Sequence, residues 1–361
     1  MKWNKKTTGL ALSSACALIM AMPAQAFEFS AMGDASYNTT DATGEYNNFA
    51  IGGLDSFVRA QIDDNTEAFI EYVFENDGSG FVLDVERLYV KRNLNETNRI
   101  GIGRFHSPLG YWNNTFHHGV IMQDTVSRPA FLDFEDGDSA ILPTHAIGLW
   151  FEGTAGPVGY ELAVANNTFL STGNFGEIGI GNVQDYSNSK TFFGRLTYAP
   201  NNSLHFGVSA KSGDILEDGS STPAYTLAAG DTVAKQTITG VDFRYKHDKF
   251  NVLGEYFNLD NKATSTVKAN GGTSGSGDAY YVQAGYQATE KLRPTLRYES
   301  FKNDGDVYFT TLGKPEYTAN VLALRYDLDD SNVLTFQYKK TSPTGGEDVT
   351  EMVLDWAFLI F

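Results

Sequence analysis

The stretch Leu204-His-Phe-Gly-Val-Ser-Ala-Lys211 alternates at every step between an apolar residue and a polar or small one. Side chains of an extended strand point alternately to its two faces, whereas those of a helix repeat about every 3.6 residues. The even-numbered residues therefore form an apolar stripe, and the odd-numbered ones, including His205 and Lys211, form a polar stripe. This period of two predicts a β-strand with one apolar and one polar face.

The same pattern recurs from residue 27 to the C-terminus, in runs of about ten residues that end at turn-forming residues. No linker, charge block or low-complexity segment divides this region, so we expect a single domain over residues 27–361. Sixteen strands are predicted, near residues 27–37, 48–62, 67–76, 81–93, 99–106, 145–153, 159–167, 190–199, 204–213, 236–247, 250–259, 278–288, 291–301, 318–328, 332–341 and 348–361.

The connections between these strands alternate in length. Every second one is short, as at 63–66 and 94–98, whereas the interleaved ones are mostly long, polar and rich in glycine, as at 168–190 and 213–235. Transmembrane β-barrels have short turns on one side of the membrane and long loops on the other, and a soluble β-sandwich has no reason to follow this asymmetry. The sequence therefore predicts an all-β, sixteen-stranded antiparallel transmembrane β-barrel.

The two stripes predict how such a barrel meets its surroundings. The stripe of Leu, Val, Phe and Tyr suits lipid, whereas a packed core would not tolerate the unpaired Arg, Lys, Glu and Gln of the other stripe. In lipid every backbone polar group must be paired, and closure of the sheet removes unpaired edges. Sixteen strands enclose more volume than side chains can fill, so we expect a water-filled channel for passive diffusion of small hydrophilic solutes and ions.

Residues 1–26 have the three parts of a secretory signal peptide. A basic start is followed by the apolar run 10–22 and by the small-residue exit Ala24-Gln-Ala26. We expect cleavage after Ala26 and export to the outer membrane of a Gram-negative bacterium, whereas the alternative, an uncleaved anchor, would need a longer apolar run. The only cysteine, Cys16, lies in this segment, so the mature chain would have no disulfide or thiolate metal site.

Charge and motifs exclude several functions. The formal net charge is −17. Residues 1–26 contain three lysines and no acidic residue, so removal of this segment would leave a net charge of −20. Such a chain would repel nucleic-acid phosphates, so nucleic acid is not an expected partner. The sequence contains no nucleophile elbow, no H-E-x-x-H and no P-loop, so we expect neither an enzyme nor a cofactor site.

The fifth predicted strand contains Gly103-Arg104, and the longest connection without the repeating pattern follows, from Ser107 to Thr144. In this feature and in its architecture the region 27–361 resembles the sixteen-stranded porins of Gram-negative bacteria. The resemblance implies that the long loop after strand five folds inward and narrows the pore, with acidic loop residues facing a row of wall arginines that includes Arg104. It also implies a homotrimer. The family loop often contains P-E-F-G-G-D, and Phe131-Leu-Asp-Phe-Glu-Asp-Gly-Asp138 is similar in type without matching it.

Acidic residues of this loop are the main candidates for a pore constriction. Carboxylates in a narrow passage with low-dielectric walls focus the electric field and attract cations, so we expect a channel that prefers cations. The alternative is a solvated external loop, in which the same charges would have no such effect. The candidates are Asp133, Glu135, Asp136 and Asp138.

Basic residues on the polar stripes are the matching candidates for the pore wall. Each has an alternative role, which is to pair with a neighbouring inner-face acid such as Glu71, Asp242 or Glu299. Together they would also suit an anion-binding track in a substrate-specific channel. The candidates are Arg59, Arg104, Arg195, Arg244, Arg293, Arg297 and Arg325, with Lys211 and Lys339 on the same stripes.

Four of the six histidines lie close to the long loop, and imidazole is a common metal ligand. Loop closure would bring them near Asp133 or Glu135, but no recognised ligand spacing is present, so ordinary loop polarity is the expectation and a metal site the alternative. These histidines are His106, His117, His118 and His145.

The chain ends in Leu354-Asp-Trp-Ala-Phe-Leu-Ile-Phe361. A terminal aromatic residue after an alternating strand resembles the signal read by the outer-membrane assembly machinery, which makes that machinery an expected partner of Phe361. The register stays open, because counting back in twos from Phe361 reaches Asp355, whereas the stripe through Ile360 and Trp356 is wholly apolar.

Other functions remain as alternatives to a general porin. A substrate-specific channel for an organic acid, a sugar or phosphate would have binding sites in the lumen, and a barrel enzyme or a structural barrel are further alternatives. The many loop carboxylates also suit divalent cations near lipopolysaccharide, which makes outer-membrane lipid an expected partner.

Overall fold

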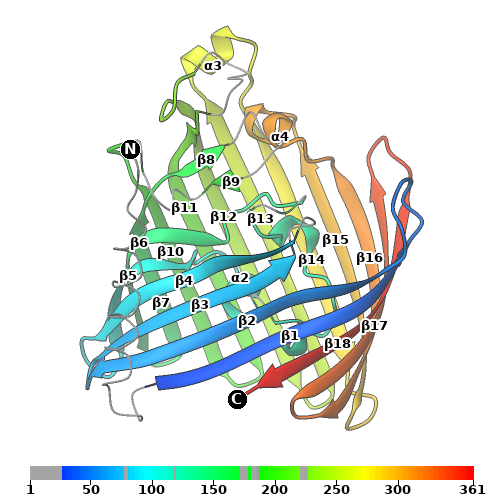
Figure 1. Ribbon diagram of the computed structural model, residues 1–361. Coiled ribbons are helices and arrows are strands. Elements are labelled where there is room, and N and C mark those ends of the chain that lie inside the picture. The colour runs from blue at the N-terminus through cyan, green and yellow to red at the C-terminus, as the bar shows by residue number, and fades with distance from the viewer. Residues whose placement is uncertain are drawn as a thin grey trace, which may run out of the picture.

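Sixteen antiparallel strands form a closed barrel in the computed structural model, which describes residues 27–76, 80–116, 119–135, 137, 139–170, 178–179, 185, 187–219 and 227–361 (Figure 1). Strands adjacent in sequence pair throughout this wall, β7 pairs with β10, and β1 pairs with both β2 and β18, which closes the sheet. The wall strands are β1 (Phe27–Thr40), β2 (Asn48–Asp63), β3 (Thr66–Asn76), β4 (Phe81–Asn93), β5 (Asn98–His106), β6 (His145–Ala155), β7 (Val158–Ala165), β10 (Thr191–Asn201), β11 (Leu204–Glu217), β12 (Thr232–His247), β13 (Phe250–Ala263), β14 (Gly275–Tyr286), β15 (Leu292–Asn303), β16 (Tyr317–Asp329), β17 (Asn332–Pro343) and β18 (Val349–Ile360).

These strands coincide with the sixteen predicted ones and confirm the fold class, but several connections differ from the prediction. β11 continues to Glu217 and β12 already begins at Thr232, within a connection predicted as loop. Two short strands, β8 (Thr168–Leu170) and β9 (Ile178–Gly179), lie in another predicted loop, and β8 pairs in parallel with the extension of β11. Runs of two or three residues are too short to show a period, so only the tertiary structure makes them strands.

The polarity of the barrel is the reverse of that of a soluble protein. On β11, Val208 is 51% exposed on the outer face, whereas Lys211 on the other face is 1% exposed. Phe206, Val241 and Leu296 are likewise exposed, in the apolar stripes of their strands. An outer surface of this kind suits lipid and would be unfavourable in water.

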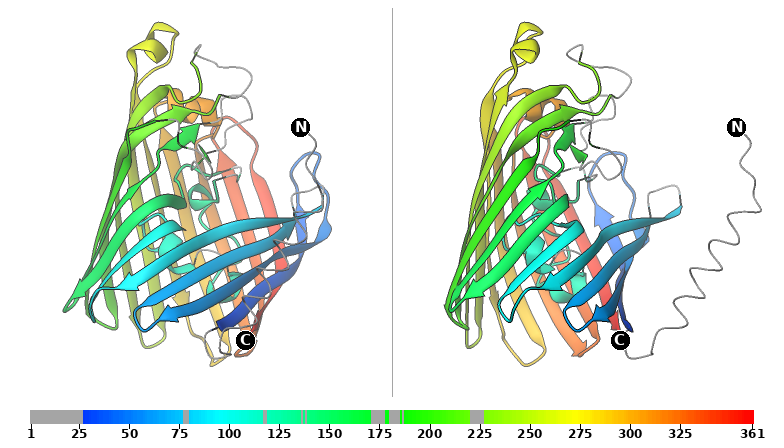
Figure 2. Two further views of the ribbon diagram at one scale, coloured as in Figure 1. Left: turned by 60° about the vertical axis from the view of Figure 1, so that its left-hand side comes forward. Right: turned by 90° about the vertical axis from the view of Figure 1, so that its left-hand side faces the viewer.

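The two ends of the barrel differ in their connections. The helices α3 (Ser265–Ala269) and α4 (Val307–Leu312) lie in connections at one end, whereas the start of β1 and the C-terminus lie at the other (Figures 1 and 2). Tight turns such as that between His247 and Phe250 join strands at the latter end. Among the described residues, no helix has the length and apolar character needed to cross a membrane.

The C-terminal strand has the register of the wholly apolar stripe. Leu354, Trp356 and Ile360 are exposed on the outer face, whereas Asp355 is 1% exposed and lies on the polar face. β18 ends at Ile360, so Phe361 follows the strand and is itself exposed. The register left open by the sequence is thereby decided.

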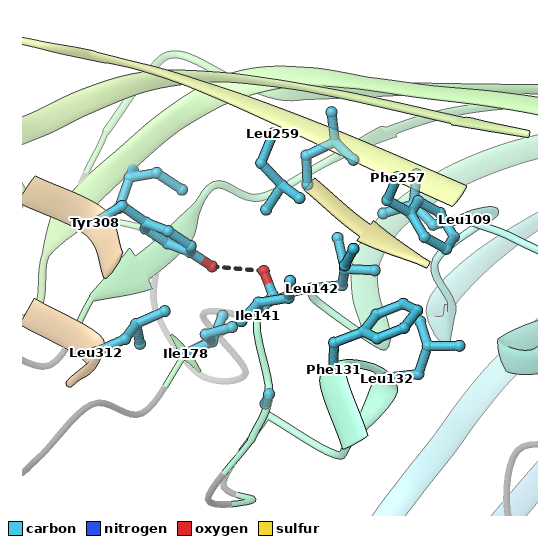
Figure 3. Packing of buried hydrophobic residues seen from close by; sticks show 14 of the residues in the cluster. Leu109, Phe131, Leu132, Ile141, Leu142, Ile178, Phe257, Leu259, Tyr308 and Leu312 are labelled. Carbon is cyan, nitrogen blue, oxygen red and sulfur yellow. Dashed lines mark hydrogen bonds between the residues drawn. The ribbon is translucent and has the colours of Figure 1, made fainter. Parts of the chain in front are cut away.

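The chain between β5 and β6, residues 107–144 (the 107–144 segment), contains α2 (Trp112–Phe116) and the 3-10 helices η2 (Val120–Met122) and η3 (Ala130–Leu132). In Figures 1 and 2 it is drawn between opposite walls of the barrel. Its apolar side chains join a buried cluster with hydrophobic side chains from the inner face of β12–β14 and with those of α4. Figure 3 shows Phe131, Ile141 and Leu142 in this cluster, with Tyr308 of α4 donating a hydrogen bond to the Ile141 carbonyl over 3.0 Å.

Candidate functional site

The 107–144 segment is fastened to β13 at its N-terminal end by a buried carboxylate. Glu255 accepts hydrogen bonds from the backbone N–H groups of Tyr111 and Trp112, both over 2.7 Å, and from the Tyr281 hydroxyl over 2.7 Å. A carboxylate with three donors satisfies backbone groups at the start of α2 that the helix itself leaves unpaired. Gly110, at φ 74°, lies so close to this carboxylate that a Cβ there would overlap it.

Arg297 and Glu299 of β15 form a second attachment point in the middle of the segment. Their side chains are fully buried and joined by an ion pair of 2.8 Å. Arg297 donates to Thr125 Oγ1 over 2.7 Å and to the Ser127 carbonyl over 2.9 Å, and Glu299 accepts from the Ala130 N–H over 2.8 Å. Hydrogen bonds to the segment thus replace the water that the two charged side chains lose on burial, and a buried ion pair needs such replacement to be stable.

Three more wall side chains extend this attachment to β15–β17. Arg293 forms an ion pair with Asp124. Arg325 donates to the Gln123 carbonyl over 2.6 Å, and Gln337 accepts from the Ser127 N–H over 3.1 Å. The segment is therefore held against β13–β17 at Tyr111–Trp112 and between Gln123 and Ala130, where several of its backbone polar groups find partners on that wall.

Aromatic residues seal the same contact. Trp112 and Phe131 are fully buried, with ring centroids 5.6 Å and 6.3 Å from that of Tyr281 on β14. The guanidinium of Arg297 lies 5.5 Å from the Trp112 ring centroid. Edge-on aromatic contacts and a cation over a ring add to the burial of apolar area, so little room is left on this side.

A network of buried charges joins the far end of the segment to β4–β6. His145 is buried between two carboxylates, with Nε2 2.9 Å from Glu86 and Nδ1 3.1 Å from Glu135, and its backbone N–H donates to Glu135 over 2.6 Å. Burial opposes ionisation of Glu135, but the charge and hydrogen bonds of His145 prevail and lower the pKa of Glu135 to about 2. Arg104 joins the network, 3.6 Å from Glu86.

The predicted acidic cluster is divided in the structure. Glu135 is bound within the network just described, and Asp133 accepts a hydrogen bond from the adjacent Phe134 N–H over 3.1 Å. Asp136 and Asp138 lie outside the described residues. The structure therefore places one of the two described acids in a structural ion pair.

The predicted basic residues all have partners. Arg293, Arg297 and Arg325 hold the 107–144 segment, and Arg104 binds the Glu86 carboxylate and carbonyl, the latter over 2.6 Å. Four of the remaining bases have partners on the wall: Arg195 with Asp242 at 2.7 Å, Arg59 with Glu28 at 3.3 Å, Lys211 with Gln236 at 2.6 Å and Lys339 with Glu351 at 3.6 Å. The guanidinium of Arg244 lies 5.9 Å from the ring centroid of Tyr111, in the 107–144 segment.

Two of the four candidate histidines are described. The rings of His106 and His145 lie 5.6 Å apart, and each is near a carboxylate. In the described part of the chain, no group of three or more ligating side chains is arranged to hold a metal ion. His117 and His118 lie outside the described residues.

A cavity of about 220 Å³ lies between the 107–144 segment and β1–β3, opposite the sealed wall, beside the point where η2 packs against Met32 of β1. Its wall side includes Asp34, Asp55 and Glu75, and its segment side includes Val126 and Arg128. The sequence analysis did not single out any of these five residues. It noted only Asp355, a neighbour of Asp34, because this acid interrupts one of the two alternating stripes of β18. For the strand residues Asp34, Asp55 and Glu75, the alternating pattern predicts the face of the sheet on which the side chain lies. It does not predict which residues lie across the barrel from that face.

Arg128 stands out because its three guanidinium nitrogens are buried and donate no hydrogen bond to any described residue. The guanidinium lies 4.0 Å from the ring centroid of Phe134. Burial lowers the pKa of Arg128 to about 10, while the charges of Asp133 and Glu135 act in the opposite direction. Arg128 therefore remains positively charged at neutral pH.

Comparison with known proteins supports the fold. No family model and no curated protein sequence matches the chain. Among solved structures it is similar to the anion-selective porin of Comamonas acidovorans (12% identity, TM-score 0.61, 92% of this chain and 99% of that one), to the outer membrane channel DcaP of Acinetobacter baumannii (13%, 0.64, 94% and 99%) and to a trimer form of OmpT, an outer membrane protein of Vibrio cholerae (9%, 0.63, 92% and 98%). At such identities the likeness shows the fold, a porin-like outer-membrane barrel.

Proposed function

We propose that this porin-like barrel is a water-filled channel of a Gram-negative outer membrane, through which small hydrophilic solutes and ions diffuse passively. The observation that carries the proposal is the closed sixteen-stranded wall with an exposed apolar outer face and a charged inner face. Lipid suits the first face, and water and polar solutes suit the second. The porins and channels among its structural neighbours agree with this function.

The 107–144 segment is proposed to form the constriction. It crosses from β5 to the wall of β13–β17 and is held there by Glu255, Arg297 and Glu299. Its attachments to β13–β17 and to β4–β6 leave the proposed passage on the side of β1–β3, where the cavity lies. A segment fixed by buried ion pairs keeps the width of such a passage constant, as a sieve for small solutes requires.

Cation preference is part of the proposal. A net charge of −17 and the carboxylates around the cavity favour cations in a narrow passage. Most of the wall bases that would favour anions are paired with acids or hold the segment. We propose no catalytic role; His145, at the start of β6, is part of the buried network that holds the segment through Glu86 and Glu135.

The proposal extends to processing and assembly. We infer cleavage after Ala26, and a homotrimer in keeping with the trimer form of the Vibrio cholerae protein. The terminal Phe361 would be read by the assembly machinery, and the exposed apolar belt would contact outer-membrane lipid, including lipopolysaccharide.

Recordings from the purified protein in planar lipid bilayers test the function. We expect ohmic steps that stay open at low voltage and a reversal potential in a KCl gradient that indicates cation preference. A barrel that inserts and gives no conductance would contradict the channel, and block by one class of solute would indicate a substrate-specific channel instead.

A further inference from the structure

The side of the cavity formed by β1–β3 carries carboxyl groups without the donors that buried carboxylates normally have. Asp55, which lines the cavity, is 3% exposed, and Asp355, on the neighbouring β18, is 1% exposed; no described N–H group or hydroxyl donates to the carboxylate oxygens of either residue. A buried carboxylate is normally hydrogen-bonded or paired, because its ionised form is costly without compensation.

These groups also come in close pairs. Asp34 of β1 interacts directly with Asp355 on the adjacent β18, and Asp55 interacts with Glu71 on the adjacent β3. Two neighbouring carboxylates cannot both ionise cheaply unless a positive charge is near. Arg87 supplies one such charge by pairing with Glu71, but the Asp34–Asp355 pair has no basic side chain bonded to it in the described structure.

Among the described residues that line the opposite side of the cavity, Arg128 is the one base. Arg128 lies on the 107–144 segment, lines the same cavity and has no hydrogen-bond partner among the described residues. At this cavity the acidic side chains are therefore on the barrel wall and the base is on the segment. The sequence analysis predicted the reverse, with acidic residues on the loop and arginines on the wall.

We propose that the β1–β3 side of the cavity is a cation-binding track, with Asp34 and Asp55 as its selectivity-determining residues and Arg128 confining cations to that side. Its ligands are small monovalent cations and solutes with an ammonium group. Multidentate metal binding is not implied, since the described residues form no metal-ligating group. Weak sites suit permeation, because an ion must be able to leave as well as enter.

This inference rests on the proposed channel function and names the residues that set its selectivity. The test is the reversal potential of single channels in a KCl gradient for the full chain, with K⁺ as probe. Asp34→Asn combined with Asp55→Asn is expected to lower the cation-to-anion permeability ratio about threefold, and Arg128→Gln to raise it about twofold. Asp348→Asn, an exposed acid paired with Lys340 outside the cavity, is the control and should change nothing.

The rival assignment is tested beside it. Asp133→Asn removes a predicted loop acid that does not line the cavity, and it should leave the ratio within the scatter of the control. A shift from Asp133→Asn with none from the wall variants or Arg128→Gln would overturn the track while leaving the channel intact. A wild-type barrel without conductance would instead contradict the channel function itself.

A chemical probe covers the case in which the double variant fails to insert. Val126 lines the cavity, and Cys16 is the only native cysteine, so Val126→Cys in a Cys16→Ser background gives one thiol at the track. A thiol reagent with a trimethylammonium group is expected to react several-fold faster than one with a sulfonate. Arg128→Gln should widen that ratio, and a sulfonate reagent that reacts as fast would refute the track.

Discussion

The wall of β13–β17 and the wall of β1–β3 both turn charged side chains away from lipid, but the 107–144 segment meets them differently. On the first wall, Glu255, Arg297 and Glu299 each bond to groups of the segment. On the second, Asp55 faces a cavity and receives no hydrogen bond from a described donor. The comparison teaches that charged side chains of the inner face stabilise the fold where the segment supplies hydrogen-bond partners. Where the segment supplies none, we propose that they interact with permeating solutes.

The largest effect is expected where the sealed wall loses an ion-pair partner. Arg297→Ala leaves Glu299 buried and unpaired, and is expected to lower the free energy of unfolding by about 3–5 kcal/mol. Urea unfolding in lipid vesicles, followed by tryptophan fluorescence, measures the loss. Arg59→Ala, in a half-exposed pair with Glu28, is the matched control and should cost less than about 1 kcal/mol. Equal losses would break the comparison.

A smaller effect is expected at the start of the segment. Glu255→Gln replaces a carboxylate that accepts three hydrogen bonds with an amide that has only one acceptor oxygen, and should cost about 1–3 kcal/mol. Limited proteolysis of the 107–144 segment should accelerate in parallel. Glu67→Gln, which weakens partly exposed ion pairs with Lys91 and Arg59, serves as control. Unchanged proteolysis in Glu255→Gln would contradict the anchor.

A still smaller effect on stability is expected on the open wall. Asp55→Asn replaces a buried carboxyl group that receives no hydrogen bond from a described donor, so the free energy of unfolding should change by less than about 1 kcal/mol, or rise. Glu299→Gln, which breaks a buried ion pair, is the contrasting variant on the sealed wall. If Asp55→Asn destabilised the barrel as much as Glu299→Gln, Asp55 would be structural after all.

The smallest effect near neutral pH concerns Glu135. Its pKa is lowered to about 2, so its contribution to stability is complete above its ordinary pKa of 4.5 and is lost as the pH falls toward 2. The difference in unfolding free energy between the wild type and Glu135→Gln should be constant from pH 8 to pH 5 and shrink below about pH 4.5. A difference that instead shrinks as the pH rises from 6 to 8 would show that deprotonation of His145 dominates the linkage.

Much of the fold could be predicted because it depends on a local period. Sixteen alternating runs, with short connections after every second one, specified the strands and their order. The short strands β8 and β9 and the helix α4 were missed, since their few residues have no period and are stabilised by contacts with distant chain, such as that of Tyr308 with Ile141.

The candidate site could be predicted only as a set of residue types. Alternation identified Arg293, Arg297 and Arg325 as inner-face bases, and the alternative of simple pairing describes most of the wall bases. It did not distinguish a base that holds a backbone carbonyl from one that lines a passage, because both occupy the same face. Asp55 was not singled out for the same reason, and Arg128 lies outside the alternating strands.

The amino-acid sequence alone determined the barrel, its polarity and the position of the long segment after β5, because strand period and turn spacing are local properties. Only the tertiary structure decided which wall the segment seals and which it leaves open. Hydrogen bonds between Glu255 and Trp112, or between Arg297 and Ser127, join residues more than 140 positions apart. No local pattern encodes such pairs, so charges that look alike along the chain acquire different roles when the barrel closes.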